Sequence, residues 1–179
     1  LDDFVSGMRE GGLSVTLKTF PGIGNVSADV TESIAENTDS LMTIRDTNFV
    51  PYASGIQAGA DCVMVSNAAY SKLTVKKVPA FMSQDIVTKL LREELGFDGI
   101  VMTSPLNDNV IENNYTNEFA VVEAVKAGCD LIVLPGNFKE CYEALITAVE
   151  EGRIDEKVIN TSVRRILQNK IQRGILVLE

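Results

Sequence analysis

The sequence predicts an α/β protein built from four βα units. One pattern recurs four times: a helical stretch ends at a glycine (Gly12, Gly59, Gly96 or Gly128), and an apolar strand follows within a few residues. Glycine is favoured just after a helix because it adopts the left-handed closing conformation without a Cβ penalty. The spacing of these glycines suits βα units of roughly 30 or more residues.

The expected strands span residues 14–20, 62–65, 99–103 and 131–134. The last three are nearly continuous apolar runs, which are typical of parallel strands covered on both faces. Two long loops, residues 21–45 and 66–82, follow the first two strands. Because functional sites of parallel α/β folds lie at the carboxyl ends of the strands, these loops are candidates for the site.

Amphipathic helices separate the strands. Residues 84–94 place Ile86, Val87, Leu90 and Leu91 on one stripe. Asn160 is a candidate N-cap for the last helix. Further helices are expected at about 119–126, 138–151 and 160–172.

The 179 residues are expected to form a single domain, 1–179. A complete (β/α)8 barrel needs about 250 residues, so four βα units correspond to half of one. The sequence leaves three arrangements open. In the first, a missing N-terminal half-barrel belongs to a longer parent chain, an option raised by a first residue that is Leu1 rather than Met. In the second, two copies close a barrel as a homodimer. In the third, the sheet is open and doubly wound.

Composition excludes several classes of function. Lysine plus arginine is 16 and aspartate plus glutamate is 25, giving a net charge of −9, which disfavours nucleic acid as a partner. No apolar run approaches the roughly 20 residues that span a membrane. The complete absence of histidine excludes Ser-His, Cys-His and His-metal chemistry. The three cysteines lack metal-site spacing and are expected to be buried apolar residues, so neither a metal nor a cofactor is predicted. The compartment, cytoplasmic or exported, is left open.

Several motifs stand in a characteristic order along the chain. They are Leu17-Lys18-Thr19-Phe20-Pro21-Gly22-Ile23-Gly24, Cys62-Val63-Met64-Val65-Ser66-Asn67, Pro79-Ala80-Phe81-Met82-Ser83, and the run from Leu90 to Leu106 that ends in Thr103-Ser104-Pro105-Leu106. In this order they resemble the catalytic barrel of glycoside hydrolase family 3, in the β-N-acetylglucosaminidase branch. The resemblance covers about Leu17 to Gly174 and corresponds to the second half of that barrel.

The resemblance implies retaining hydrolysis of O-glycosyl bonds by a carboxylate nucleophile and a proton donor. The family's nucleophilic aspartate falls on Ser104, and its acid/base histidine falls on Thr31. Lys18, Asp29 and Asn67 fall on positions that contact or orient the sugar. The expected partner is an amino sugar or a peptidoglycan-derived saccharide.

A serine hydroxyl is neutral at neutral pH and needs an adjacent base to become a nucleophile. The chain is therefore predicted to be hydrolytically inactive as written, although the sequence leaves open whether it is an enzyme. One alternative is an active hydrolase that uses another group, such as Asp108, with the rest of the barrel supplied by further chain or by a partner. Another is a structural half-barrel that dimerises.

Overall fold

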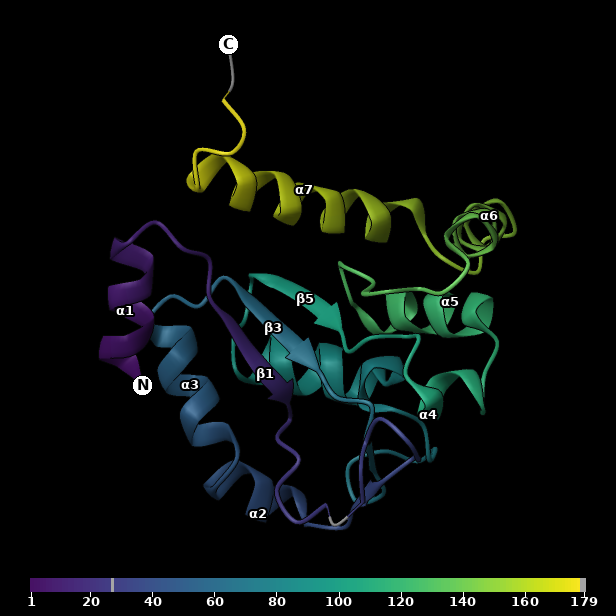
Figure 1. The fold of residues 1–179 in the computed structure, drawn as a ribbon, viewed down its shortest axis with the longest axis horizontal. Helices are drawn as coiled ribbons and strands as arrows, with labels where there is room; N and C mark the ends of the chain where they lie inside the picture. The colour runs from purple at the N-terminus through teal and green to yellow at the C-terminus, as the bar shows by residue number, and fades with distance from the viewer. Residues whose placement is uncertain (27, 178–179) are drawn as a thin grey trace.

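Three parallel strands form the centre of the fold, which a computed structural model describes for residues 1–26 and 28–177. β1 (Thr16–Phe20), β3 (Cys62–Val65) and β5 (Ile100–Thr103) lie in the order β1-β3-β5, and both pairs are parallel (Figure 1). The register shifts between Lys18 and Phe20, where β1 carries an irregularity against β3. The predicted α/β class is confirmed, with the first strand starting at Thr16.

Helices precede and follow the strands. They are α1 (Asp2–Glu10), α2 (Leu41–Asp46), α3 (Phe49–Gln57), η1 (Ala80–Met82), η2 (Asp85–Glu94), α4 (Asn109–Glu112), α5 (Asn117–Ala127), α6 (Phe138–Glu150) and α7 (Glu156–Gln172). Among the described residues, none of these helices has the length and apolar character needed to cross a bilayer.

The fourth expected strand, residues 131–134, is reduced to a single parallel bridge between Met102 and Leu131. The segment still runs beside β5, because the Thr103 amide donates to the Leu131 carbonyl at 3.0 Å. The next ladder bond is replaced, since the Val133 amide donates to the Thr103 hydroxyl at 3.0 Å. Leu134 then adopts a φ of 46°. A side-chain acceptor and a left-handed residue therefore end the pairing where an apolar run predicted a strand.

The long loops after β1 and β3 contain a feature that the sequence did not predict. β2 (Glu36–Asn37) and β4 (Ala69–Tyr70) pair in parallel as a separate two-stranded sheet. Asn37 and Tyr70 are fully buried in this pairing. The two loops are thereby joined to each other near the carboxyl ends of the central strands.

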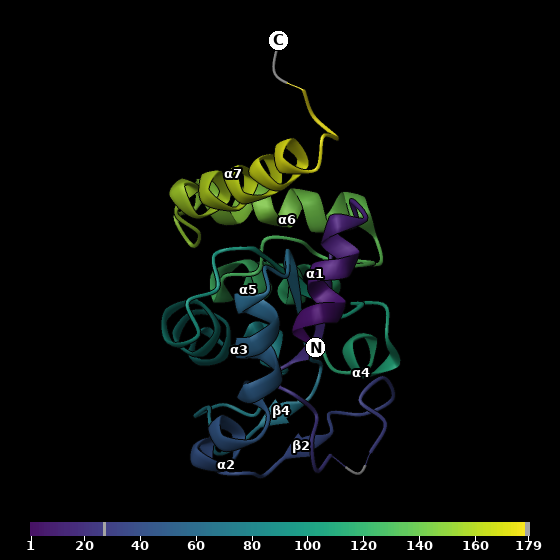
Figure 2. The same ribbon diagram turned by 90° about the vertical axis from the view of Figure 1, so that its left-hand side faces the viewer.

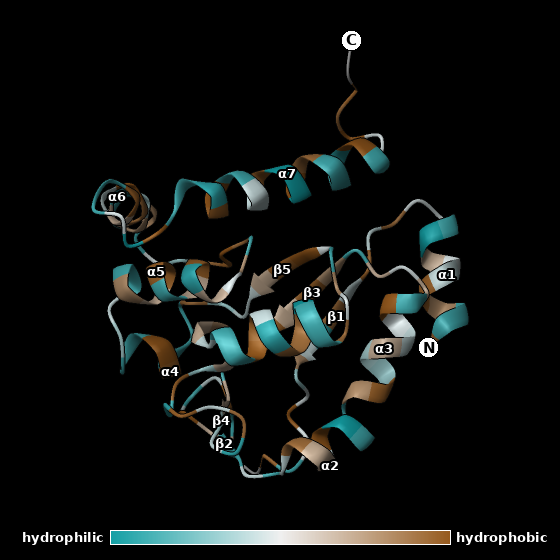
Figure 3. Ribbon diagram, turned by 180° about the vertical axis from the view of Figure 1, so that it is seen from behind, coloured by the Kyte–Doolittle hydropathy of each residue, from teal (hydrophilic) through white to brown (hydrophobic). Residues whose placement is uncertain are grey.

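One face of the central sheet carries the apolar core. Leu17, Val63 and Val101 stand at the same level of β1, β3 and β5, and all three are buried. Leu17 lies directly against α3, because a Cβ added at Gly55 would come within 2.8 Å of its side chain. Figure 3 shows the apolar colour of these strands behind the amphipathic helices. This face of the sheet is therefore the one that the helices cover.

The opposite face of the sheet is more open than the sequence predicted. Successive strand residues alternate between faces, so Lys18, Met64 and Met102 point away from the helices. Lys18 is exposed, and both methionines are half-buried. The apolar runs indicated strands covered on both faces, but within the described residues only one face is fully covered.

The helix between β3 and β5 confirms the predicted stripe. η2 is wound as a π-helix, and Ile86, Val87, Leu90 and Leu91 are all buried on it. Residues one, four and five apart stay on one side of a π-helix as they do on an α-helix. The stripe therefore faces the core although the helix is a π-helix. The glycines after the helices behave as expected, since Gly128 has a φ of 110° at the end of α5.

The last helix begins earlier than predicted. Asp155, rather than Asn160, caps α7, and its carboxylate accepts the Lys157 amide at 2.9 Å. The apolar residues expected to bury this helix remain partly exposed, with Val163 at 46% and Leu167 at 42%. α7 is therefore held largely by polar contacts, which lie at the amino ends of the strands.

Asp61 is the first of two buried carboxylates that make these contacts. It accepts the Val15 amide at 2.9 Å, and Arg173 Nη2 reaches both of its carboxylate oxygens, at 2.5 and 2.6 Å. Asn169 donates to it from the same helix at 3.2 Å, and Arg9 of α1 lies 3.5 Å away. One carboxylate thus joins α1, α7 and the beginnings of β1 and β3.

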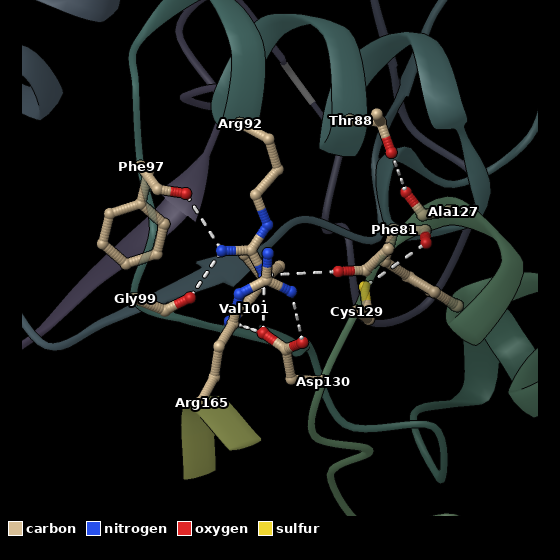
Figure 4. A network of polar contacts seen from close by, with 11 residues as sticks. Phe81, Thr88, Arg92, Phe97, Gly99, Val101, Ala127, Cys129, Asp130 and Arg165 are labelled. Carbon is tan, nitrogen blue, oxygen red and sulfur yellow. Dashed lines mark hydrogen bonds and ion pairs between the residues drawn. The ribbon is translucent and has the colours of Figure 1, made fainter. Parts of the chain in front are cut away.

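Asp130 repeats this arrangement two units further along the chain (Figure 4). Its side chain is fully buried and accepts the Val101 amide at 2.9 Å. Arg92 of η2 and Arg165 of α7 reach its two oxygens at 2.5 and 3.1 Å. Arg92 also donates to the Phe97 carbonyl at 3.0 Å. Figure 2 shows the result: α7 closes one end of the molecule, and β2, β4 and α2 lie at the other.

Replacing Asp61 by alanine is expected to lower the free energy of unfolding by about 3–5 kcal/mol, because Arg173 would be left buried without its partner. Chemical denaturation followed by circular dichroism measures the loss. Asp98→Ala is the matched control, since Asp98 follows the equivalent glycine but is exposed, and it should change stability by less than about 0.5 kcal/mol. Equal effects of the two changes would contradict the role given to Asp61.

Candidate functional site

The candidate site lies at the carboxyl ends of β1, β3 and β5. Loops from all three strands meet there, at the end of the molecule opposite α7 (Figure 2). The loop after β1 reaches the segment after β5, because the Val110 amide donates to the Thr31 carbonyl at 2.8 Å. Asn109 reinforces this contact with a 2.8 Å bond to Glu32.

Ser104 occupies the first position after β5. It is 6% exposed, and its Oγ donates to the Val65 carbonyl at 2.9 Å. The Ser104 amide donates to the same carbonyl at 3.0 Å. The hydroxyl proton is therefore committed to a backbone acceptor of the neighbouring strand, and no described side chain accepts it as a base.

Asp29 and Thr31 form a closed local pair. The Thr31 hydroxyl donates to Asp29 Oδ1 at 2.7 Å, and the Thr31 amide donates to the same oxygen at 2.9 Å. These two bonds, the hydroxyl bond first, lower the pKa of Asp29. Asp29 is thus held as a carboxylate by the threonine two residues along the chain.

Asn67 and Asp108 meet across the ends of β3 and β5. Asn67 is 1% exposed, and its Nδ2 donates to Asp108 Oδ2 at 2.8 Å. Its Oδ1 is buried and has no hydrogen-bond partner among the described residues. Burial raises the pKa of Asp108, the charges of Asp29 and Glu32 raise it further, and the bond from Asn67 opposes them. Asp108 is thus an acidic group at this edge whose pKa is raised, in contrast to Asp29.

Lys18 is the remaining predicted site residue, and it lies on β1. Its side chain is exposed on the open face of the sheet, and it lines a separate hollow of about 560 Å³ together with Gly22, Gly24 and Asn48. The structure therefore joins Asn67 to Asp108 and Asp29 to Thr31. Among the described residues, Lys18 forms no hydrogen bond or ion pair with any of these four.

Three buried or half-buried polar residues that the sequence did not single out fix the Gly22–Gly24 turn. Asn48 and the Tyr70 hydroxyl donate to the Gly22 carbonyl at 3.0 and 3.1 Å. Asn37 donates to the Ile23 carbonyl at 3.1 Å. These two asparagines and the tyrosine carry no spacing signal in the sequence, so only the folded contacts reveal this role.

Changing Asp108 to asparagine is expected to raise the melting temperature at neutral pH. The folded-state pKa of Asp108 is raised above 3.8, so the ionised form costs the folded state stability at pH values above the folded pKa. Below 3.8 both states bind the proton and the cost vanishes.

The gain should therefore shrink as the pH falls through the folded pKa of Asp108. Thermal unfolding across a pH series measures it, relative to Asp98→Asn, which removes the same charge from an exposed position. A gain that stays constant down to acidic pH would contradict this prediction.

The chain has a parallel α/β sheet, and polar residues gather at the carboxyl ends of its strands. Parallel α/β enzymes, both barrels and doubly wound sheets, hold their sites at that edge. The family model described as the glycosyl hydrolase family 3 N terminal domain matches residues 2–169. The chain therefore belongs to glycosyl hydrolase family 3, and the resemblance inferred from its motifs is confirmed.

Individual relatives agree with this assignment. The β-hexosaminidase of Stenotrophomonas maltophilia strain K279a is 33% identical over 173 residues, which cover 97% of this chain and 48% of that protein. The β-hexosaminidase of Xylella fastidiosa strain M23 is 33% identical over 131 residues, or 73% of this chain and 38% of that protein. This chain thus spans less than half the length of either relative.

A solved structure matches the fold closely. The family 3 β-N-acetylglucosaminidase from Paenibacillus sp. str. FPU-7 superposes with a TM-score of 0.93 at 32% identity, covering 99% of this chain and 35% of that chain. The β-N-acetylhexosaminidase from Beutenbergia cavernae DSM 12333 gives a TM-score of 0.85 at 30% identity, covering 94% and 50%.

Proposed function

We propose that residues 1–179 form one domain equivalent to the second half of a (β/α)8 barrel. Support comes from three parallel strands with helices between them and a fourth segment bridged to β5 at Leu131. The outer edge of β1 has no strand paired to it within the described residues. A whole barrel would then need further strands, either from more of the same chain or from a second copy.

We further propose that this domain binds a saccharide related to amino sugars without cleaving it by the family's retaining route. The observation that carries this proposal is the Ser104 hydroxyl, which is bound to the Val65 carbonyl at 2.9 Å where the nucleophilic carboxylate is expected. An oxocarbenium-like transition state needs an anion at that point. A buried neutral hydroxyl with its proton engaged supplies none.

The proposal extends to the group that would protonate the leaving oxygen, which the resemblance places at Thr31. Thr31 donates its own proton to Asp29, and a threonine hydroxyl does not titrate near neutral pH. A positioned general acid or base typically contributes about 10²- to 10⁴-fold to the rate. Loss of both groups removes the two features that the retaining mechanism uses to break the bond, while the loops that surround the sugar position are kept.

The full-length protein is expected to release no nitrophenol from nitrophenyl N-acetyl-β-glucosaminide above the uncatalysed rate. Continuous absorbance assays with folded protein measure this. Turnover at the ordinary enzyme rate of about 1–10³ s⁻¹ would overturn the proposal.

Ser104→Asp is the informative variant of this experiment. It restores a carboxylate at the proposed nucleophile position, and a dinitrophenyl substrate needs little protonation of its leaving group. We expect a burst of dinitrophenol and a covalent glycosyl adduct detectable by mass spectrometry. Ser104→Asn, of nearly the same size but neutral, is the control and should give neither. An equal response of both variants would contradict the position assigned to Ser104.

A second candidate function is an active hydrolase that uses Asp108. It is favoured by the burial and raised pKa of this carboxyl group, which are properties of a general acid. Should the protein hydrolyse the nitrophenyl substrate, Asp108→Asn would distinguish the two functions. The control Asp98→Asn should keep the activity. If Asp108→Asn keeps it too, Asp108 is excluded as the catalytic group.

A further inference from the structure

A hollow of about 410 Å³ lies where the loop after β4 passes the start of η2 and one side of α5. The loop contributes residues 74–76 and 78, the start of η2 contributes Ser83 and Gln84, and α5 contributes Phe119. The volume is that of a small-molecule site. None of the residues discussed above at the carboxyl ends of the strands lines this hollow, so it is a separate feature of the molecule.

Phe119 gives the hollow an aromatic wall. Its side chain is 50% exposed, although it is large and apolar. The ring stacks on Tyr115 with centroids 5.9 Å apart and an angle of 8° between the planes. This stack orients the ring, and the exposed part remains available to a ligand. The face of an aromatic ring is electron-rich and attracts weakly positive C–H groups.

The Ser83 hydroxyl is a second and independent observation. Ser83 is 6% exposed, and its hydroxyl has no hydrogen-bond partner among the described residues. The buried side-chain atoms there that lack a partner and are sealed from the surface belong to Asn67 and Asn117. The Ser83 hydroxyl is therefore open to the hollow that this residue lines. A hydroxyl both donates and accepts, so it suits a ligand with hydroxyl groups of its own.

Gln84 presents a fixed acceptor beside this hydroxyl. Its Nε2 donates to the Lys126 carbonyl at the end of α5 at 2.8 Å. That bond determines which end of the amide is engaged, and it leaves Oε1 without a donor among the described residues. The wall of the hollow thus combines one aromatic ring with a hydroxyl and an amide oxygen.

The charged residues of the hollow mostly neutralise one another. Lys126 pairs with Glu123 at 2.6 Å, and Asp85 pairs with Lys89 at 2.7 Å. Lys76 remains, and it is exposed in the loop after β4. An ionic ligand would therefore find little net charge to attract it, whereas an uncharged ligand with many hydroxyls would find donors and acceptors.

We propose that this hollow binds one pyranose ring of an uncharged saccharide chain, with a C–H face of the ring on Phe119 and hydroxyls on Ser83 and Gln84. A pyranose is apolar on its faces and polar around its rim, which matches the combined wall. The inference rests on the proposed function for the class of ligand, and it adds a second binding position outside the carboxyl ends of the strands.

A fluorescent reporter tests this position directly. The 179 residues contain no tryptophan, so Phe119→Trp places an indole at the hollow and keeps an aromatic face there. The probe is a β-1,4 hexamer of N-acetylglucosamine, titrated into the full-length protein. We expect a saturable shift of the emission to shorter wavelength, measured as the difference from the unsubstituted protein, because a stacked sugar excludes water from the indole.

Phe138→Trp is the matched control. Phe138 is also an exposed phenylalanine on a helix, stacked on Tyr142 with centroids 6.2 Å apart, but neither residue lines the hollow. Its emission should not change. No change in folded Phe119→Trp, or an equal change in the two variants, would overturn the inference. A larger response of Phe119→Trp to an uncharged hexapeptide than to the sugar would also overturn it.

A polar variant makes the test independent of the reporter. Ser83→Ala should weaken binding of the hexamer at the hollow roughly two- to tenfold, as loss of one neutral hydrogen bond predicts. Ser162→Ala is the control, since Ser162 is similarly buried but lies on α7. Isothermal titration calorimetry measures both affinities, and equal values overturn the inference. Thermal unfolding verifies that each variant is folded.

The same titration separates this inference from the proposed function. Binding of the hexamer to the unsubstituted protein, without a response at Phe119→Trp or Ser83→Ala, leaves the proposed function standing and overturns only the second position. Absence of binding to folded protein overturns both.

Discussion

Two buried carboxylates at the amino ends of the strands organise this molecule. Asp61 and Asp130 each accept a backbone amide near the start of the neighbouring strand and, at the same time, pair with two arginines from or directly after the surrounding helices. Desolvating a carboxylate is costly unless its partners replace the lost water. These networks supply the partners, and in doing so they attach α7, whose apolar residues alone are too exposed to hold it in place.

The two ends of the sheet consequently differ in how their carboxylates are neutralised. At the amino ends, charges are paired and buried, and the order of elements depends on that pairing. At the carboxyl ends, Asp29, Glu32 and Asp108 meet only neutral donors among the described residues. Parallel α/β folds commonly separate stability from function in this way, with conserved scaffolding at one end and variable loops at the other. This chain keeps the separation, with paired carboxylates at one end and unpaired ones at the other among the described residues.

The sequence was sufficient for the fold wherever local pattern and burial agreed. The prediction was correct for the four glycines that follow helices and for the apolar stripe on residues 84–94. Helix closure and amphipathic spacing are local properties, so the sequence shows them directly. The fourth strand was overpredicted. Its apolar composition suits a strand, but the Thr103 hydroxyl intercepts a ladder bond, and a hydrogen bond between distant segments leaves no mark in the pattern.

For the candidate site, too, the sequence revealed some features and the tertiary structure others. Composition by itself determined that this chain contributes no histidine. The resemblance predicted that Ser104 and Thr31 fall where the family has its nucleophile and its proton donor. Only the tertiary structure decided that the Ser104 proton is engaged by Val65, that Asp108 contacts Asn67, and that Lys18 is exposed on the open face of the sheet. The reason is physical: residue identity fixes which groups can ionise or donate, whereas their partners and burial depend on loops from separate strands meeting at one edge.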